Sequence, residues 1–211
     1  MKYLTLLLII IGLSACNNAQ KEARELQKYL EQHSDHHDHE GHDHGGSTAF
    51  WGALQQLCGK AYAGTVVAAP ENDTTFANKD LVMHLRACAD EEIRIPFFVG
   101  DDRSRTWVLR LMGERIQLKH DHRHEDGSPD AITMYGGIAS NSGSDQLQIF
   151  PADQYTLDLL PGAAASVWWI ELSPGEHFTY NLRRLGTERF FSVRFDLTQE
   201  VPEPAAPWGT E

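Results

Sequence analysis

Alternation of apolar and polar residues between residues 81 and 197 is the feature that most constrains how this chain folds. In EIRIPFFV, residues 92–99, every second side chain is apolar, and RIQLKHDH, residues 115–122, begins in the same way. A period of two residues is typical of β-strands with one buried and one exposed face. The strands predicted on this basis cover residues 81–88, 92–99, 106–112, 115–122, 131–137, 147–152, 167–172, 177–184 and 189–197.

Short turn sequences separate the predicted strands, such as DGSP at residues 126–129 and SPG at residues 173–175. Strands joined by tight turns pair as antiparallel neighbours, and about eight to ten of them bury their apolar faces in a closed barrel or in two packed sheets. We therefore predict one all-β domain over residues 47–200, a single antiparallel barrel or sandwich, which begins with a helix at residues 49–60.

The strand number and the leading helix resemble the calycin group, whose lipocalin-like barrels hold small ligands. Arg105 and Trp107 share the predicted inward face of one strand. The resemblance makes them ligand-binding residues for a small apolar or acidic molecule, because a buried guanidinium pairs well with a carboxylate. Outward salt bridging by Arg105 is the alternative. The stretches KHDHRHEDG, residues 119–127, and TMYGG, residues 133–137, also resemble a group of uncharacterised exported bacterial proteins, which implies no particular activity.

The first residues predict export and lipidation. A lysine precedes a short apolar run, residues 4–13, which has about half of the ~20 residues needed to span a bilayer and is typical of a signal peptide. The motif LSAC at residues 13–16 resembles the lipobox of bacterial lipoproteins. That resemblance implies removal of residues 1–15 and attachment of acyl chains, palmitate among them, to Cys16. Asn17 resembles the residue found there in lipoproteins sorted to the outer membrane.

The charge of the chain limits its partners. It contains 18 Lys and Arg against 30 Asp and Glu, a formal net charge of −12. Nucleic-acid binding requires a basic surface, so nucleic acid is not an expected partner. We expect a monomer anchored to the membrane of the cell envelope through its lipid. Residues 16–46 are predicted to form a flexible linker, and the proline-rich residues 201–211 a disordered tail.

Two cysteines remain once Cys16 carries lipid. In an oxidising exported compartment, Cys58 and Cys88 are expected to form a disulfide. The bond would close a loop of about 30 residues and stabilise the fold by ~3 kcal/mol. A pair of metal-binding or redox thiols is the alternative, although no Cys-x-x-Cys spacing occurs.

Six histidines fall within HSDHHDHEGHDH, residues 33–44. Imidazoles beside carboxylates bind Zn²⁺ and other divalent transition metals, but a linker cannot fix the coordination geometry and so binds them unselectively. A solvated spacer is the alternative. The residues predicted to sequester metal here are His36, His37, His39, His42 and His44.

A second histidine cluster continues the predicted strand at residues 115–122. Alternation places His120, His122 and His124 on its inward face, where they could hold a metal together with a ligand from another strand. In the alternative interpretation, the strand ends near His122, and His124 and Glu125 lie in a solvated loop.

A metal enzyme is the second functional interpretation. His120, His122 and Glu125, together with His177 in SPGEHFTYN, resemble parts of the two metal motifs of cupins. Glu125 follows the histidines too closely for that motif, and a Pro-Gly hairpin turn also accounts for the second segment. The leading prediction is a lipid-anchored protein whose β domain binds a small ligand or a metal, with no catalytic residue assigned. A structural module of the envelope is the third interpretation.

Overall fold

The computed structural model describes residues 24–25, 28 and 45–210 of the chain. The predicted signal peptide, the lipidation site Cys16 and the histidine tract at residues 33–44 lie outside the described residues.

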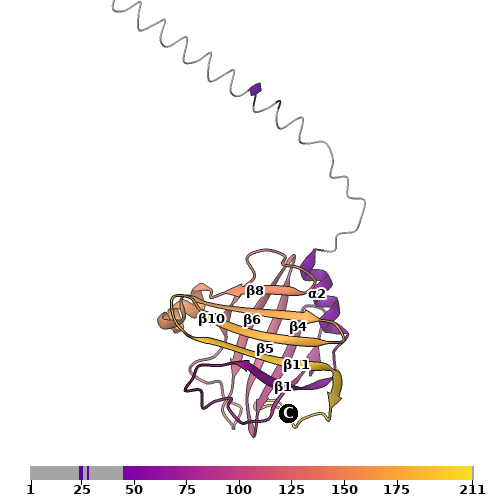
Figure 1. Ribbon diagram of the computed structural model, residues 1–211, viewed down its shortest axis with the longest axis vertical. Coiled ribbons are helices and arrows are strands. Elements are labelled where there is room, and N and C mark those ends of the chain that lie inside the picture. Colours follow the sequence, from indigo (N-terminus) through magenta and orange to yellow (C-terminus); the bar gives the residue numbers. More distant parts are fainter. Residues whose placement is uncertain (1–23, 26–27, 29–44, 211) are drawn as a thin grey trace, which may run out of the picture. The chain divides into compact units, whose positions relative to one another are not determined.

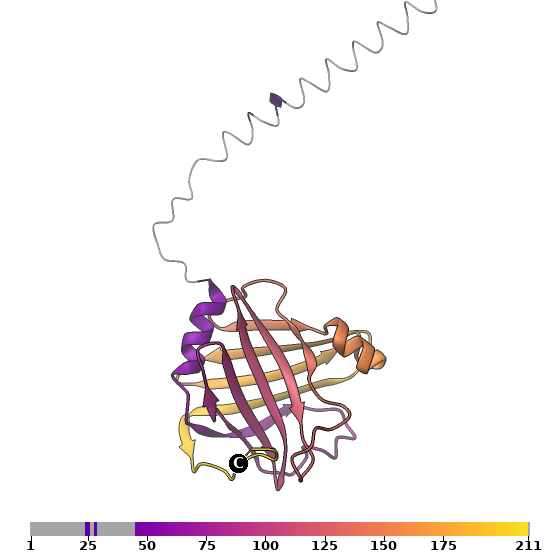
Figure 2. The same cartoon turned by 180° about the vertical axis from the view of Figure 1, so that it is seen from behind.

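Eleven strands form one antiparallel sheet that curves into a nearly closed barrel (Figures 1 and 2). The strands follow the order β7-β6-β5-β4-β2-β1-β11-β10-β9-β8, and the short β3 pairs with β4. The predicted all-β fold is therefore confirmed, and it is a barrel and not a sandwich. The strands are β1 (Ala61–Ala68), β2 (Leu81–His84), β3 (Ala87–Cys88), β4 (Glu92–Val99), β5 (Asp102–Met112), β6 (Arg115–His122), β7 (Tyr135–Ile138), β8 (Leu147–Pro151), β9 (Ser166–Ser173), β10 (His177–Arg184) and β11 (Phe190–Val201).

Three strands, β4, β6 and β10, have the bounds that alternation predicted. The strand predicted at residues 81–88 is instead divided into β2 and β3. The first strand, β1, was not predicted because Gly64 resembles a break between elements. An ideal Cβ at Gly64 would lie 2.6 Å from Cε1 of Phe195, so glycine at this position lets an aromatic ring pack across the strand.

The predicted helix is present as α2 (Gly46–Gln55), and it begins three residues and ends five residues earlier than predicted. Phe50 and Leu54 on its inner face are buried in the core. The indole of Trp51 donates a hydrogen bond to the carbonyl of Asp90, just before β4 (2.9 Å). The helix therefore covers the end of the barrel where β4 begins.

The disulfide between Cys58 and Cys88 is present, with a Cα–Cα distance of 6.2 Å. It joins the turn that follows α2 to β3. The bond therefore fixes the leading helix covalently to the barrel wall.

Two short helices, α3 (Gln154–Leu159) and η1 (Pro161–Ala163), follow β8 and were not predicted. Asp153 caps α3 by accepting a hydrogen bond from the amide of Thr156 (3.0 Å). Both helices lie at the end of the barrel opposite to α2 (Figures 1 and 2). Their signal is weak in the sequence because each is shorter than two full turns.

The C-terminal segment corrects the prediction of a disordered tail at residues 201–211. Val201 is the last residue of β11, and Pro207 is buried. The amide of Trp208 donates to the carbonyl of Arg103 (3.1 Å), and the Arg103 guanidinium donates to the carbonyl of Ala206 (3.2 Å). Proline has no amide hydrogen to satisfy, so a proline-rich segment can lie along a strand while only a few backbone groups pair.

Candidate functional site

A pocket of about 380 Å³ opens at the end of the barrel that α2 leaves uncovered. Its walls come from the last residues of β4, β6 and β10, the first residues of β5 and β9, and residues near α3 and η1. Seven of the 21 residues that line it are Phe, Trp or Tyr. They are Phe76, Phe97, Trp107, Tyr135, Trp168, Tyr180 and Phe191.

Three rings of the pocket lining are stacked on one another. The ring of Trp107 lies 4.8 Å from that of Phe97 and 4.4 Å from that of Tyr180, with interplanar angles of 17° and 18°. Each of these residues is on an inward-facing position of its strand, and all are buried. Offset stacking of this kind stabilises aromatic clusters beyond the burial of their area, and it keeps the rings in fixed orientations.

The loop between β1 and β2 adds Phe76 to this aromatic lining. Phe76 in this loop packs against Phe191, with ring centroids 4.3 Å apart. The Asp73 carboxylate accepts hydrogen bonds from the backbone amides of Phe76 (2.9 Å) and Ala77 (3.1 Å). These bonds hold the loop in the shape that brings Phe76 to the pocket.

His120 on β6 forms the innermost polar group of the pocket. Its Nδ1 lies 3.0 Å from the carbonyl oxygen of Tyr135, which can only accept, so Nδ1 carries the hydrogen. Its Nε2 then accepts a hydrogen bond from the hydroxyl of Tyr180 (2.7 Å). Burial lowers the pKa of His120 to about 3 and raises the pKa of Tyr180 well above its usual value. Both side chains are therefore neutral at physiological pH.

His122, two residues further along β6, lies nearer the mouth of the pocket. Its Nε2 is 3.1 Å from the hydroxyl of Tyr135. Burial, and then the positive charge of Arg105, lowers the pKa of His122. Burial raises the pKa of Tyr135 to about 12. The two histidines thus share one wall but face different partners.

Arg105 and Trp107, the predicted ligand-binding residues, both line the pocket. Arg105 forms an ion pair with Asp102 at the start of β5, and its guanidinium lies 5.8 Å from the centre of the Phe76 ring. Period-two alternation correctly placed both side chains inside the barrel. Whether they contact a ligand stays a prediction.

The predicted metal ligands of the domain are not brought together. Strand β6 ends at His122, and His124 and Glu125 lie exposed in the turn that follows, where the amide of Gly127 donates to the carbonyl of His124 (2.9 Å). In the part of the chain that the structure describes, no group of three or more His, Cys, Asp or Glu side chains is arranged to hold a metal ion.

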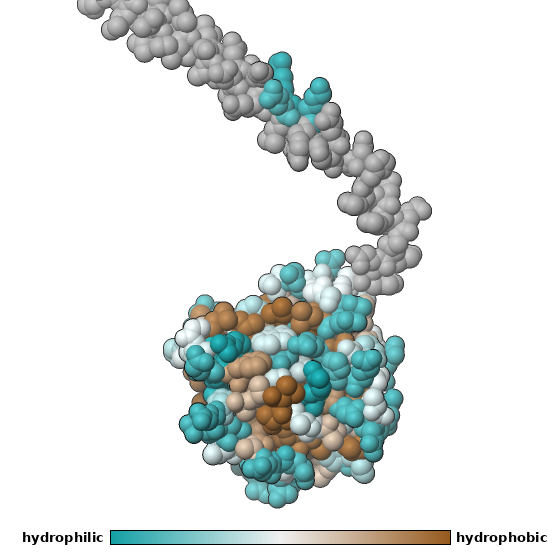
Figure 3. Space-filling view, in the orientation of Figure 1, coloured by the Kyte–Doolittle hydropathy of each residue, from teal (hydrophilic) through white to brown (hydrophobic). Residues whose placement is uncertain are grey.

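His177 lies apart from the two pocket histidines, at the other end of the barrel wall. It borders a shallow groove on the outer surface of β8 and β9, beside Trp169 and Glu171. This face of the molecule carries apolar side chains among hydrophilic ones (Figure 3). The set His120, His122, Glu125 and His177 expected of a cupin-like centre is therefore spread over the interior, a loop and the outer surface.

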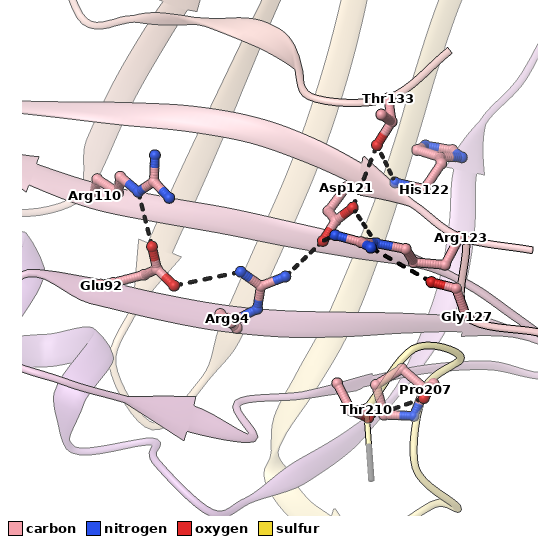
Figure 4. A network of polar contacts seen from close by, with 10 residues as sticks. All are labelled: Glu92, Arg94, Arg110, Asp121, His122, Arg123, Gly127, Thr133, Pro207 and Thr210. Carbon is pink, nitrogen blue, oxygen red and sulfur yellow. Dashed lines mark hydrogen bonds and ion pairs between the residues drawn. The ribbon is translucent and has the colours of Figure 1, made fainter. Parts of the chain in front are cut away.

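The outer side of β6 carries an ion-pair network that supports the pocket wall (Figure 4). Asp121 is only 3% exposed and accepts hydrogen bonds from Arg94 (2.6 Å) and Arg123 (2.9 Å). Glu92 extends the network by binding both Arg94 (3.3 Å) and Arg110 (2.8 Å). Burial alone would raise the pKa of Asp121, but its two arginine partners outweigh burial and lower it. The network joins β4, β5 and β6 directly behind the two histidines.

Several residues of the pocket were not predicted. Tyr180 could have been found, since it shares the inward face of β10 with Phe178 and Leu182. Phe76 lies in a loop and carries no periodic signal, and Arg189, predicted as the first residue of a strand, immediately precedes β11. Their place in the pocket depends on how the loops fold back over the barrel end.

Comparisons with known proteins found no family model, curated protein or solved structure that matches this chain. Among the residues that the structure describes, no helix is both long and apolar enough to cross a bilayer.

Protonation of His120 should make the fold less stable in acid. Because its pKa is about 3 when folded and near 6.5 otherwise, only the unfolded chain takes up this proton between those pH values. The group then removes up to about 1.4 kcal/mol of stability per pH unit as the pH falls below 6.5. In urea unfolding at pH 7 and pH 5, the wild type should lose about 2 kcal/mol more than His120→Gln.

The exposed His124 supplies the matched control, since His124→Gln should keep the pH dependence of the wild type. Equal losses of stability in His120→Gln and the wild type would show that His120 does not stay neutral in the folded protein.

Proposed function

We propose that the barrel binds a small organic ligand in the aromatic pocket, and that it acts as a binding protein. The observation that carries this proposal is the pocket of about 380 Å³ inside the barrel, walled by fixed aromatic rings. Ligand pockets commonly measure about 300–1,000 Å³ and combine apolar walls with a few well-placed polar groups. His120, His122, Tyr135 and Tyr180 supply such groups here.

The state of the polar groups favours binding over catalysis. A general acid or base works best when its pKa is close to the working pH. The pKa of His120 is about 3, that of Tyr135 is about 12, and both ring nitrogens of His120 already have hydrogen-bond partners. Such groups orient a ligand by hydrogen bonding and transfer protons poorly.

Filling the pocket should abolish binding of a small apolar probe. The fluorescent dye N-phenyl-1-naphthylamine should bind saturably to the full-length protein. Leu182 lines the pocket, so Leu182→Trp places an indole in the space the dye needs. We expect the variant to bind the dye at least about tenfold more weakly, as dye-fluorescence titration would measure.

Leu185→Trp is the matched control, because Leu185 is 58% exposed and lies outside the pocket. Its affinity for the dye should equal that of the wild type. Dye that does not saturate, or that binds Leu182→Trp as well as the wild type, would contradict an interior site and favour a structural envelope module.

We further propose that the chain is lipid-anchored at the outer membrane of a bacterial cell envelope. The support is the sequence LSAC at residues 13–16, with Asn17 next to it. A lipid-modified Cys16 would hold the barrel near the membrane, because several acyl chains together anchor far more firmly than one.

If Cys16 is lipidated, replacing its sulfur atom by oxygen should release the protein from the membrane. In a Gram-negative host, the wild type should partition into the detergent phase and show an acylated Cys16 by mass spectrometry. Cys16→Ser should lose the lipid and leave the membrane fraction, because serine does not offer the thiol that is modified. A wild-type protein without a mass shift at Cys16 would disprove the anchor.

Metal capture by the linker is the last part of the proposal. Its support is the six histidines in residues 33–44, since the described part of the domain brings no comparable set together. Replacement of His36, His37, His39, His42 and His44 by asparagine should remove most of the heat of Zn²⁺ binding in calorimetry. The control His124→Asn/His177→Asn should keep it. Unchanged heat in the linker variant would assign the metal to the domain instead.

A further inference from the structure

Most charged residues that line the pocket are positive, although the whole chain is negatively charged. The protein has 30 acidic and 18 basic residues, with a net charge of −12. The pocket is lined by three arginines, Arg105, Arg184 and Arg189, and by a single acidic residue, Asp73. An acidic protein that gathers guanidinium groups around its cavity creates a local site for a negative charge.

The one acidic residue in the wall is already engaged. Asp73 accepts hydrogen bonds from the backbone amides of Phe76 (2.9 Å), Ala77 (3.1 Å) and Thr75 (3.3 Å). It forms no ion pair with an arginine among the described residues. Its carboxylate therefore shapes the loop and does not pair with the arginines of the pocket.

Two of the three arginines lack a carboxylate partner. Arg105 pairs with Asp102, but within residues 45–210 neither Arg184 nor Arg189 forms an ion pair. The only side-chain bond of Arg184 in this region is a weak one, from Nε to Oγ of Ser166 (3.4 Å). The remaining N–H groups of its planar fork suit a bidentate acidic group.

The arginines converge although they come from different strands. Arg105 lies near the start of β5, Arg184 is the last residue of β10, and Arg189 immediately precedes β11. The amide of Arg184 donates a hydrogen bond to the carbonyl of Arg189 (3.0 Å), so these two residues lie opposite each other between β10 and β11, and Arg105 lines the same pocket. The charges of Arg105 and Arg189 both lower the pKa of Tyr135, although burial and the charge of Asp130 raise it. A negative group in the pocket would therefore meet more than one guanidinium group.

The apolar part of the pocket suits an aromatic molecule. Seven of the 21 residues that line it are Phe, Trp or Tyr, and some of these rings are fixed by stacking, as Trp107 is on Tyr180 (4.4 Å) and Tyr135 is on His120 (4.6 Å). The stacked faces fill each other, so a ligand would contact the ring edges and the outer faces, where edge-to-face and offset contacts favour another aromatic ring.

We propose that the ligand is an aromatic anion, with its rings packed against the aromatic lining of the pocket and its acidic group held by Arg184 and Arg189, assisted by Arg105. This inference rests on the proposed function, since it names the ligand class of the same pocket. In this proposal, the aromatic rings supply most of the affinity, and the arginines select a negatively charged ligand over a neutral one.

Two dyes with the same ring system separate charge from shape. 8-Anilinonaphthalene-1-sulfonate carries a sulfonate that N-phenyl-1-naphthylamine lacks. Fluorescence titration of the full-length protein should show the sulfonate dye bound about tenfold more tightly than the neutral dye. The variant Arg184→Gln/Arg189→Gln should remove this preference and change the affinity for the neutral dye by less than about twofold, because the rings are untouched.

The control Arg183→Gln/Arg194→Gln removes the same two charges from residues that do not line the pocket. It should keep the preference for the sulfonate dye, and circular dichroism should show both double variants folded. Equal wild-type affinities for the two dyes would overturn the anion inference and leave the proposed binding function intact. A preference that survives in Arg184→Gln/Arg189→Gln would also overturn it. Failure of the neutral dye to saturate would instead count against the binding function itself.

Discussion

Closure of the sheet between β7 and β8 is the constraint on which the rest of the structure depends. No ladder of backbone hydrogen bonds joins these two strands. Instead, the amide and the carbonyl of Gly136 both bond to Oγ1 of Thr156, each at 2.7 Å, and the amide of Asp153 donates to the same carbonyl (3.0 Å). The neighbouring Gly137 must lack a side chain, since an ideal Cβ would lie 1.7 Å from the carbonyl oxygen of Pro151. The first turn of α3 thus satisfies an edge that would otherwise be open.

The seam also positions the pocket. Tyr135 precedes the two glycines, so the contact that closes the barrel fixes the residue whose carbonyl orients His120. On the outer side, Lys119 of β6 forms an ion pair with Asp153, and Asp121 binds two arginines. Strand β6 is therefore held from outside by charges while its inward histidines remain neutral. Fixed polar groups of this kind bind a ligand without a further cost of ordering them.

The two ends of the barrel have different roles. At one end, α2 fills the interior with Phe50 and Leu54 and is attached by the Cys58–Cys88 disulfide. At the other end, loops and short helices surround an aromatic cavity bordered by arginines. Among the arginines that line this cavity, Arg189 is exposed and Arg105 and Arg184 are partly buried. Their positive charges can act on a ligand as it enters, although the whole protein is acidic.

The sequence by itself determined most of the strands and their inward faces. The bounds of β4, β6 and β10 and the inward side of Arg105 and Trp107 followed from local alternation, and the pairing of Cys58 with Cys88 followed from the number of cysteines. These properties could be predicted because the direction of a side chain on a strand depends only on its neighbours in sequence.

Only the tertiary structure decided which side chains meet. It brought Tyr180 to His120 across 60 residues, gathered Arg105, Arg184 and Arg189 around one cavity, and left His124 outside at a turn. Such encounters depend on strand order, on closure of the seam and on how the loops fold over the barrel end. No local pattern records them, because the residues that meet belong to segments far apart in the chain.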